Sequence, residues 1–306
     1  AQDPQNLPVF KRAWVYGTNT TIRNLKIYDE TSDTGHEPLV WVDGSSTGAT
    51  VDGCKVAGHV GGDSYYGIHV APGASATKLI GTDIQFVRMG VVGDHASFLT
   101  LEDLWFDNIG SDCMHMNGMN GLVIDGCKGC ATILGGDGVH ADFLQFSGDP
   151  SSLVDVRNCV CNNHTVAHPN AQLQFILASN TAAIVTDLSI TNNLGFTGDA
   201  RIQASVMGVA VVENNTVLTN RGVNGHKIDG YIEIYDAGAT SVSVVNNVTD
   251  RLVHEGDPGM NHLCVGDYLS VYGPTVNDGG ALTEADFTAV FGSQADPAGD
   301  NMGWHA

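Results

Sequence analysis

Seven short segments of the chain align with one another as the same apolar strand, with a polar residue at one fixed place. They read YYGIHVA, RMGVVGD, SDCMHMN, HADFLQF, NAQLQFI, DARIQAS and GYIEIYD. Aligned on their central apolar residue, they form one column: His69, Val92, His115, Gln145, Gln174, Gln203 and Glu233. All but Val92 are polar. Parallel strands stacked about 4.8 Å apart present such columns on their outer face, which is a plausible floor for a ligand groove.

A second series of short strands precedes the first, and each of its members ends at a Gly, Asn or Asp. These turn residues are Gly53, Asp103, Gly126, Asn158, Asp187, Asn215 and Asn247. The first interval of 50 residues divides at Gly81, and the later ones are 23, 32, 29, 28 and 32 residues. Such residues suit turns that need a positive φ. A period of 20 to 35 residues built from short strands indicates a solenoid.

The pattern therefore predicts an all-β chain folded as a single-stranded parallel β-helix of about nine rungs. The helix is expected over residues 20–256. Residues 1–19 are expected to cap its open end, which would otherwise leave strand edges unpaired. Residues 257–306 are expected to form a C-terminal extension with a short helix at 282–292, capped by Thr283.

Two inner or corner ladders are expected from the repeat. An asparagine ladder at one bend is predicted from Asn162, Asn163, Asn192, Asn193, Asn214, Asn215, Asn246 and Asn247. An inward-facing stack is predicted from Cys54, Cys127 and Cys159 together with Leu104, Leu188, Thr216 and Val248. The alternative for the cysteines is a zinc site that includes Cys130 and Cys161. The repeat position favours the structural stack, and no metal site is assigned.

With this repeat, residues 20–255 resemble the right-handed parallel β-helix superfamily. Pectate lyases, polygalacturonases, mannuronan epimerases and phage tailspikes belong to it. The resemblance implies a right-handed helix and polysaccharide-related chemistry. The segment from His140 to Gln145 is similar to the H-x-D-x-x-Q segments of polysaccharide-active β-helix proteins. No single family is identified, because members share architecture more than motifs.

The net charge of −21 excludes one large class of partners. Nucleic-acid binding needs a basic footprint, and this chain has 13 Lys and Arg against 34 Asp and Glu. No apolar stretch approaches the roughly 18–20 residues that span a membrane. An acidic surface suits salty or extracellular conditions, so we expect a secreted, cell-surface or virion protein. Tailspikes of this fold are trimers, which makes a homotrimer the oligomer to test.

The densest polar groups lie on two neighbouring strands. In the aligned register Asp112 lies beside Asp142 and His115 beside Gln145, about 5 Å apart. Two carboxylates at this distance either share a proton, which raises one pKa, or hold a cation such as Ca²⁺. The first arrangement suits acid/base cleavage of a glycosidic bond. Asp112, Asp142, His115 and His140 are therefore the candidate catalytic residues; the alternative is that the aspartates only cap turns.

Other polar side chains of the outer face are predicted to contact the ligand. They are His69, Gln145, Gln174, Arg201, Gln203, Tyr231, Glu233 and Asp236. Arg201 shares the face of Gln203 by strand alternation. It would either hold a sugar carboxylate or pair with Glu233. The four tryptophans, Trp14, Trp41, Trp105 and Trp304, look scattered and predict no aromatic platform.

Three functions fit these residues. The favoured one is a polysaccharide-degrading enzyme, a glycoside hydrolase or a polysaccharide lyase, that holds an extended glycan along one outer face. A lyase would need a base such as His115, His140 or Tyr231, and Arg201 or a bound cation to neutralise the uronate. The second is a non-catalytic glycan-binding adhesin or phage-tail protein. The third is a structural spacer whose ladder stabilises only itself.

Overall fold

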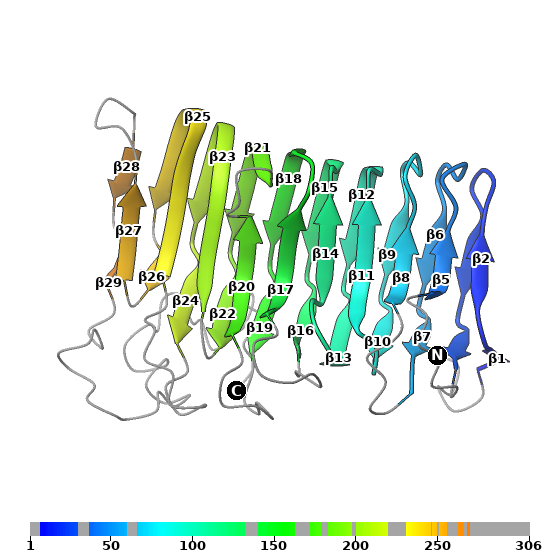
Figure 1. The fold of residues 1–306 in the computed structure, drawn as a ribbon. Helices are drawn as coiled ribbons and strands as arrows, with labels where there is room; N and C mark the ends of the chain where they lie inside the picture. The colour runs from blue at the N-terminus through cyan, green and yellow to red at the C-terminus, as the bar shows by residue number, and fades with distance from the viewer. Residues whose placement is uncertain are drawn as a thin grey trace.

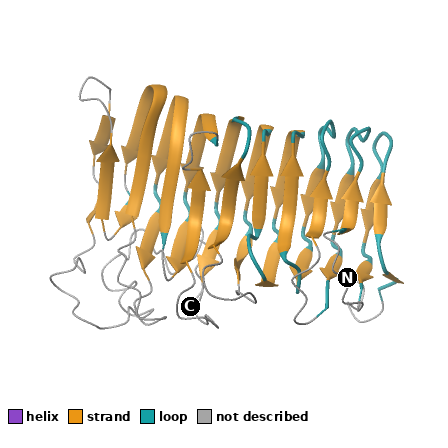
Figure 2. Cartoon of the chain, in the orientation of Figure 1, coloured by secondary structure: helices purple, strands orange, loops and turns teal. Residues whose placement is uncertain are grey.

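The computed structural model describes most of the first 250 residues and parts of the next twenty. The described ranges are 7–29, 37–59, 66–131, 140–162, 172–178, 183–197, 200–219, 231–245, 247–249, 251–255, 262–265 and 268–269. Their regular structure consists of β-strands, which stack side by side along one long axis (Figures 1 and 2). Every pairing between neighbouring turns is parallel. The fold is a right-handed parallel β-helix, as predicted.

Three strand series run along this axis. The first is β2 (Ala13–Val15), β5 (Pro38–Val42), β8 (Tyr66–Val70), β11 (Met89–Asp94), β14 (Met114–Asn117), β17 (His140–Ser147), β20 (Gln172–Ala178), β23 (Arg201–Glu213), β25 (Tyr231–Val245) and β27 (Arg251–Glu255). The second is β3 (Thr21–Arg23), β6 (Thr50–Asp52), β9 (Lys78–Ile80), β12 (Ser97–Glu102), β15 (Asn120–Asp125), β18 (Ser151–Arg157), β21 (Ile184–Thr191) and β28 (His262–Val265). The long strands β23 and β25 also continue this second series with their C-terminal halves.

The third series forms a sheet of its own with 11 strands. It is β1 (Val9–Phe10), β4 (Lys26–Tyr28), β7 (Lys55–Ala57), β10 (Asp83–Gln85), β13 (Trp105–Ile109), β16 (Lys128–Ala131), β19 (Val160–Asn162), β22 (Leu194–Thr197), β24 (Thr216–Thr219), β26 (Val248–Thr249) and β29 (Tyr268–Leu269). Nine of these strands, β4 to β26, lie within 20–256 and match the predicted nine rungs. β1 and β29 add one strand at each end.

The two terminal segments remain predictions as far as their roles are concerned. Strands β1 and β2 pair with β4 and β5, so residues 9–15 continue the stack. Their capping role is not tested by this pairing. The predicted helix at 282–292 with Thr283 lies outside the described residues. No described segment forms a helix of the length and apolar character needed to cross a membrane.

The core is a set of apolar columns that run from rung to rung. One column joins direct register partners: Val40, Ile68, Val91, Met114, Leu144, Ile176, Ile202 and Ile232. Each of these side chains is at most 1% exposed. A second column holds stacked rings, with Phe143 6.3 Å from Phe106 and 5.5 Å from Phe175 between centroids. Because each inward residue packs on the rungs before and after it, the core fixes which residues pair.

The turn that follows the second series repeats with a left-handed residue on each rung. It is occupied by Asn24, Gly53, Gly81, Asp103, Gly126, Asn158, Asn192 and Asn214, all with φ between 51° and 65°. The predictions at Gly53, Gly81, Asp103, Gly126 and Asn158 are confirmed. The prediction at Asp187 is wrong, because Asp187 lies in a bulge of β21. Asn215 follows the turn residue Asn214, and the side chains of Asn215 and Asn247 are buried.

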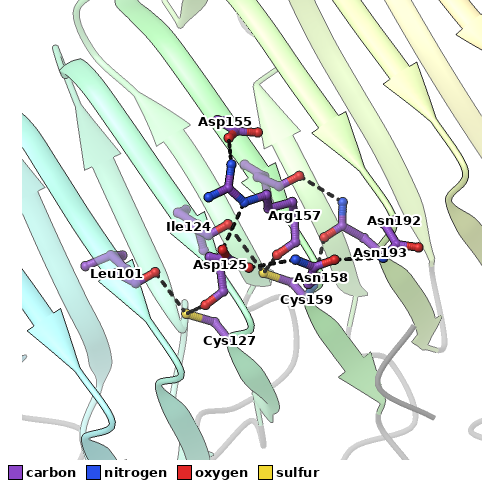
Figure 3. A network of polar contacts seen from close by, with 11 residues as sticks. Leu101, Ile124, Asp125, Cys127, Asp155, Arg157, Asn158, Cys159, Asn192 and Asn193 are labelled. Carbon is purple, nitrogen blue, oxygen red and sulfur yellow. Dashed lines mark hydrogen bonds and ion pairs between the residues drawn. The ribbon is translucent and has the colours of Figure 1, made fainter. Parts of the chain in front are cut away.

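The inward position after this turn carries a ladder of cysteines that continues into asparagines (Figure 3). Cys54, Cys127 and Cys159 are buried and free, as the predicted stack requires. Desolvation raises the pKa of the Cys159 thiol well above its ordinary value, so the thiol stays protonated. The backbone N–H of Cys159 donates to Asn193 Oδ1 at 2.9 Å. The same inward position holds Thr82 and the predicted Leu104 on the two rungs between Cys54 and Cys127. Thiols, these two residues and amides thus share one inner column.

Three asparagines complete this column and are 0% exposed: Asn193, Asn215 and Asn247. Asn193 Nδ2 donates to Asn215 Oδ1 at 2.9 Å, and Asn215 Nδ2 donates to Asn247 Oδ1 at 3.0 Å. The asparagine ladder is therefore confirmed for these three. The placement of Leu188, Thr216 and Val248 in the cysteine column is wrong, because Leu188 lies in the second series and the other two lie one residue later. Asn162 is also outside the ladder, opposite Phe196.

The buried asparagine ladder predicts a stability effect. Replacing Asn215 with Ala leaves the backbone N–H of Asn193 without its acceptor and the Ile190 carbonyl without the Asn215 amide. It also removes one of the two bonds made by Asn193 Nδ2 and one of the two accepted by Asn247 Oδ1. Each unsatisfied buried group costs about 1–3 kcal/mol. We therefore expect the free energy of unfolding, measured by urea denaturation, to fall by about 2–4 kcal/mol. The exposed Asn120→Ala variant is the control and should change stability by less than about 0.5 kcal/mol. Equal effects of both variants would contradict a role for the ladder.

Candidate functional site

The outward positions of the first series form one column, named here the outer column. In order it contains Trp14, Trp41, His69, Val92, His115, Gln145, Leu177, Gln203 and Glu233. The predicted alignment is confirmed from His69 to Gln145 and again from Gln203 to Glu233. It is wrong at one rung, where Leu177 takes the place expected for Gln174.

The shift at Gln174 follows from packing. Strand β20 pairs with β17 so that Leu144 lies opposite Ile176, which keeps large apolar residues inside. This register also brings the rings of Phe143 and Phe175 together. Gln174 is consequently opposite Asp142 rather than Gln145, and it is 2% exposed. Its predicted contact with ligand stays untested, but its place is not in the outer column.

The N-terminal end of the outer column is aromatic. Trp14 and Trp41 are direct register partners, and Trp41 is the partner of His69. The Trp41 and His69 rings meet edge to face with centroids 4.7 Å apart, and Tyr66 lies 6.3 Å from His69. Trp14 is 57% exposed. The interpretation that these tryptophans are scattered is therefore wrong, because strands β2 and β5 place them one rung apart.

The other end of the outer column is a hydrogen-bonded polar cluster. Gln203 Nε2 donates to Glu233 Oε2 at 2.6 Å and to the Tyr235 hydroxyl at 2.8 Å. Arg201 lies over the ring of Tyr231, with its Cζ 5.3 Å from the ring centroid. Glu233 is 8% exposed, and the Gln203 amide holds its carboxylate within the sheet surface. Arg201 and Gln203 present the more accessible polar atoms of this end.

At the centre of the outer column, His115 of β14 belongs to a relay of three side chains, with Asp112 just before β14 and Ser147 on β17. His115 Nδ1 lies 2.9 Å from Asp112 Oδ2, and His115 Nε2 lies 2.6 Å from Ser147 Oγ. Asp112 is 1% exposed, whereas the His115 side chain is 22% exposed. A carboxylate accepts hydrogen bonds only, so Nδ1 donates to Asp112. In the neutral form of the imidazole, Nε2 then accepts the hydrogen bond of the Ser147 hydroxyl and is oriented as a base toward it.

Local backbone geometry makes this relay possible. The two residues between Asp112 and His115 are Cys113 and Met114, and both are fully buried. Two consecutive inward residues break the usual alternation, which leaves Asp112 and His115 on the same side of the strand. Ser147 is opposite Asn117 in the register and so lies diagonally across from His115. Sequence reasoning missed Ser147 because it compared only directly opposite residues.

The predicted neighbourhood of Asp112 and Asp142 is confirmed, but both carboxylates are buried. Asp112 Oδ1 accepts the backbone N–H of Asp142 at 3.1 Å, and the N–H of Cys113 donates to the Asp142 carbonyl at 2.9 Å. Asp142 is 0% exposed. Asp112 therefore uses its two oxygens to fix His115 and the next rung. The catalytic roles predicted for these two residues remain untested.

An acidic cluster adjoins the relay on the same edge of the strands. His95 Nδ1 lies 2.6 Å from Asp94 Oδ1, and its Nε2 lies 2.8 Å from Asp149 Oδ2. Asn117 joins the cluster, since its amide donates to Asp94 at 2.9 Å and its Oδ1 accepts the N–H of Asp149 at 2.8 Å. The hydrogen bonds to Asp149 and Asp94 raise the pKa of His95. Burial lowers the pKa of His69, against the attraction of Asp94.

The described residues leave two candidate side chains, and the predicted Ca²⁺, without a test. The side chains of His140 and Asp236 lie outside the described part, although the backbone places them in β17 and β25. Among the described residues, no group of three or more His, Cys, Asp and Glu side chains is arranged to hold a metal ion. The roles of His140, Asp236 and Ca²⁺ stay predictions.

Three of the solved structures that are similar to this chain are an adhesin, a lyase and a tailspike protein. The Streptococcus pneumoniae surface protein and adhesin PfbA matches 82% of this chain and 67% of its own, with 12% identity and a TM-score of 0.50. An alginate lyase from Paenibacillus sp. str. FPU-7 matches 81% of this chain and 91% of its own, with 14% identity and a TM-score of 0.41. The Dettilon tailspike protein (gp208) matches 88% and 61%, with 11% identity and a TM-score of 0.40.

These similarities concern the fold. Comparison with protein-family profiles finds no match, and neither does comparison with curated protein sequences. At identities of 11–14%, these likenesses carry no residue roles over to this chain. The function has to be argued from the side chains themselves.

The His95 cluster predicts a pH-dependent stability difference. The folded-state pKa of His95 is raised above 6.5, so its stabilising effect is complete below about pH 6.5 and is lost as the pH rises through the folded value. We expect wild type to exceed His95→Gln in melting temperature at pH 5.5 and to match it at high pH. The difference should stay within about 1 kcal/mol, because the ion pairs are exposed.

The control for this experiment is His59→Gln, since His59 is exposed. Burial lowers the pKa of the half-buried His69, so this residue disfavours the folded state at low pH. Both variants retain His69, so its effect cancels in the comparison. A His95→Gln difference that grows with rising pH would contradict the predicted sign.

Proposed function

We propose that the protein binds an extended polysaccharide along the outer column and acts on it with His115 as a general base. The observation that carries this proposal is the continuity of one column. Trp14 and Trp41 at one end, His115 in the centre and Gln203 and Glu233 at the other end share one line of register partners. His115 carries Asp112 and Ser147 with it through its two ring nitrogens. A linear ligand along the axis would contact all three parts.

The dimensions and chemistry of the column suit a glycan. Nine strands about 4.8 Å apart give a line of roughly 38 Å, enough for several sugar units. The Trp14, Trp41 and Tyr66 rings offer apolar faces with polar edges, which match the apolar and hydroxylated faces of a sugar. Gln203, with its amide, and Arg201, with its guanidinium, offer hydrogen bonds to hydroxyl or carboxylate groups. The net charge of −21 favours a neutral glycan or one neutralised by cations.

The relay supports base chemistry better than a pair of carboxylic acids. Acid and base groups that cleave a glycosidic bond both have to reach it. Asp112 and Asp142 are 1% and 0% exposed, whereas His115 is partly open to the ligand side. We therefore assign the base to His115 and a positioning role to Asp112. Arg201 is three strands from His115, about 14 Å along the stack, so it would bind a neighbouring sugar unit rather than the reacting one.

Glycan binding without catalysis is the second candidate. It is favoured by the Gln203, Glu233 and Tyr235 cluster, whose amide and hydroxyl groups bind hydroxyls without acid/base work. The pneumococcal protein with this fold is described as a surface protein and adhesin. An extracellular location fits both candidates. Turnover of a bound glycan separates them, because an adhesin binds it unchanged.

The aromatic end predicts a large loss of affinity on truncation. Trp41→Ala removes the ring that joins Trp14 to His69 in the column. Aromatic anchors commonly contribute more than 1.4 kcal/mol, so we expect Kd to rise at least about tenfold. Binding is measured by calorimetry on the glycan selected from an array of neutral and uronate polysaccharides.

The matched control for Trp41 is Trp105→Ala. Trp105 is 49% exposed but belongs to β13 in the third series, away from the outer column. It should bind the selected glycan as wild type does. Equal affinities of the two variants would contradict the proposed binding face. A wild-type protein that binds no glycan on the array would contradict it as well.

The catalytic part predicts a separation of binding from turnover. His115→Asn removes the base while the aromatic end is retained. General base catalysis contributes about 10²–10⁴-fold, so we expect turnover to fall by that factor with Kd within about threefold of wild type. Products are followed by reducing ends, by the absorbance of unsaturated sugars and by released acids. A His115→Asn variant with wild-type turnover would exclude His115 as the base.

A further inference from the structure

We infer that Ser147 is a nucleophile and that the site hydrolyses ester groups carried by the bound polysaccharide. The inference rests on the proposed function for the ligand and goes beyond it by naming the bond that is cleaved. The order of the contacts supports this inference. Asp112 Oδ2 lies 2.9 Å from His115 Nδ1, and His115 Nε2 lies 2.6 Å from Ser147 Oγ. A hydroxyl, an imidazole and a carboxylate in this order form the general arrangement of a serine nucleophile with its base and orienting acid.

The relay is built on rigid elements. Asp112 is held by the backbone N–H of Asp142, and His115 and Ser147 lie on paired strands β14 and β17. Met114 and Leu144, which precede His115 and Gln145 on these strands, pack against each other in the core. A hydroxyl at 2.6 Å occupies the Nε2 lone pair, so a base acting here takes its proton from Ser147 first. This is why the reaction assigned is acyl transfer, in preference to direct proton abstraction from a sugar carbon.

The proposed reaction balances in two halves. Ser147 Oγ attacks the ester carbonyl carbon while His115 Nε2 takes the hydroxyl proton. The tetrahedral intermediate breaks the bond between the carbonyl carbon and the sugar oxygen, and His115 returns its proton to that oxygen. Water then attacks the acyl-serine with His115 as base, and the carboxylic acid leaves as Ser147 recovers its proton. The net change is ester plus water to alcohol plus acid, with no other reactant.

Gln145 is the residue we assign to the developing oxyanion. It lies two residues before Ser147 on the same strand, roughly 6.5 Å away along β17, and opposite His115 in the register. Its side chain is half-buried and carries an amide that can donate to an oxyanion. The substrate class that follows is an O-acylated polysaccharide, with the sugar chain along the outer column and the acyl group over Ser147.

The first test labels the wild-type protein with a fluorophosphonate, which reacts with activated serines. We expect one adduct per chain, on the peptide that contains Ser147, and no adduct after Ser147→Ala. The second test follows hydrolysis of p-nitrophenyl acetate and acetate release from an O-acetylated glycan bound by the protein. Loss of the nucleophile should lower kcat/KM by at least about 10³-fold.

Two variants control these measurements. Ser152→Ala removes an equivalent hydroxyl bond, from Ser152 to Asn120 at 3.1 Å on the second series, and should leave labelling and hydrolysis unchanged. Asp112→Asn tests positioning: it should lower kcat with KM within about threefold, because an amide no longer holds the correct imidazole tautomer.

The outcomes distinguish this inference from the proposed function. Binding that depends on Trp41, together with unlabelled Ser147 or undiminished hydrolysis in Ser147→Ala, overturns the nucleophile and leaves the glycan face standing. Unsaturated or reducing products that persist in Ser147→Ala do the same and identify cleavage of the glycan backbone instead. Labelled Ser147 with ester hydrolysis, in a protein that binds no glycan, supports the nucleophile and overturns its polysaccharide substrate.

Discussion

The register between parallel strands is the constraint on which the rest of the molecule depends. Each outward side chain of the first series is placed by the inward residue next to it, which packs on the rungs before and after. Val91, Met114 and Leu144 pair directly in the core, and His115 and Gln145 therefore pair directly outside it. A slip of one residue would exchange the core and solvent faces of a strand. The polar column is a consequence of apolar packing.

This dependence explains how far the sequence could predict the fold. The repeat of short strands and left-handed turns predicted the parallel β-helix, its nine inner rungs and the column from His69 to Gln145. It failed at Gln174 because the register there is set by the ring stack of Phe143 and Phe175, a contact between segments that alignment on one apolar residue does not weigh. The repeat misplaced the turn at Asp187 because an Asp suits a positive φ in a bulge as well as in a turn.

The candidate site was predictable where it follows directly opposite residues and was missed elsewhere. Asp112 and His115 were found because both belong to the aligned segments. Ser147 was missed because its bond to His115 runs diagonally between rungs. Trp14 and Trp41 were missed because β2 and β5 precede the aligned segments, although their pairing continues the same column. An alignment of strand sequences compares only directly opposite residues of the aligned strands. It therefore does not show diagonal contacts or strands outside the alignment.

The same reasoning separates the buried carboxylates from the partly exposed base. A charged group inside a stack of apolar columns is stable only if its oxygens accept hydrogen bonds. Asp112 meets this condition with His115 and the N–H of Asp142, so its burial and its orienting role have one cause. A carboxylate held in this way keeps the imidazole in one tautomer, with its second nitrogen toward Ser147. The carboxylate that accepts a hydrogen bond from the next rung is therefore also the one that would orient the base.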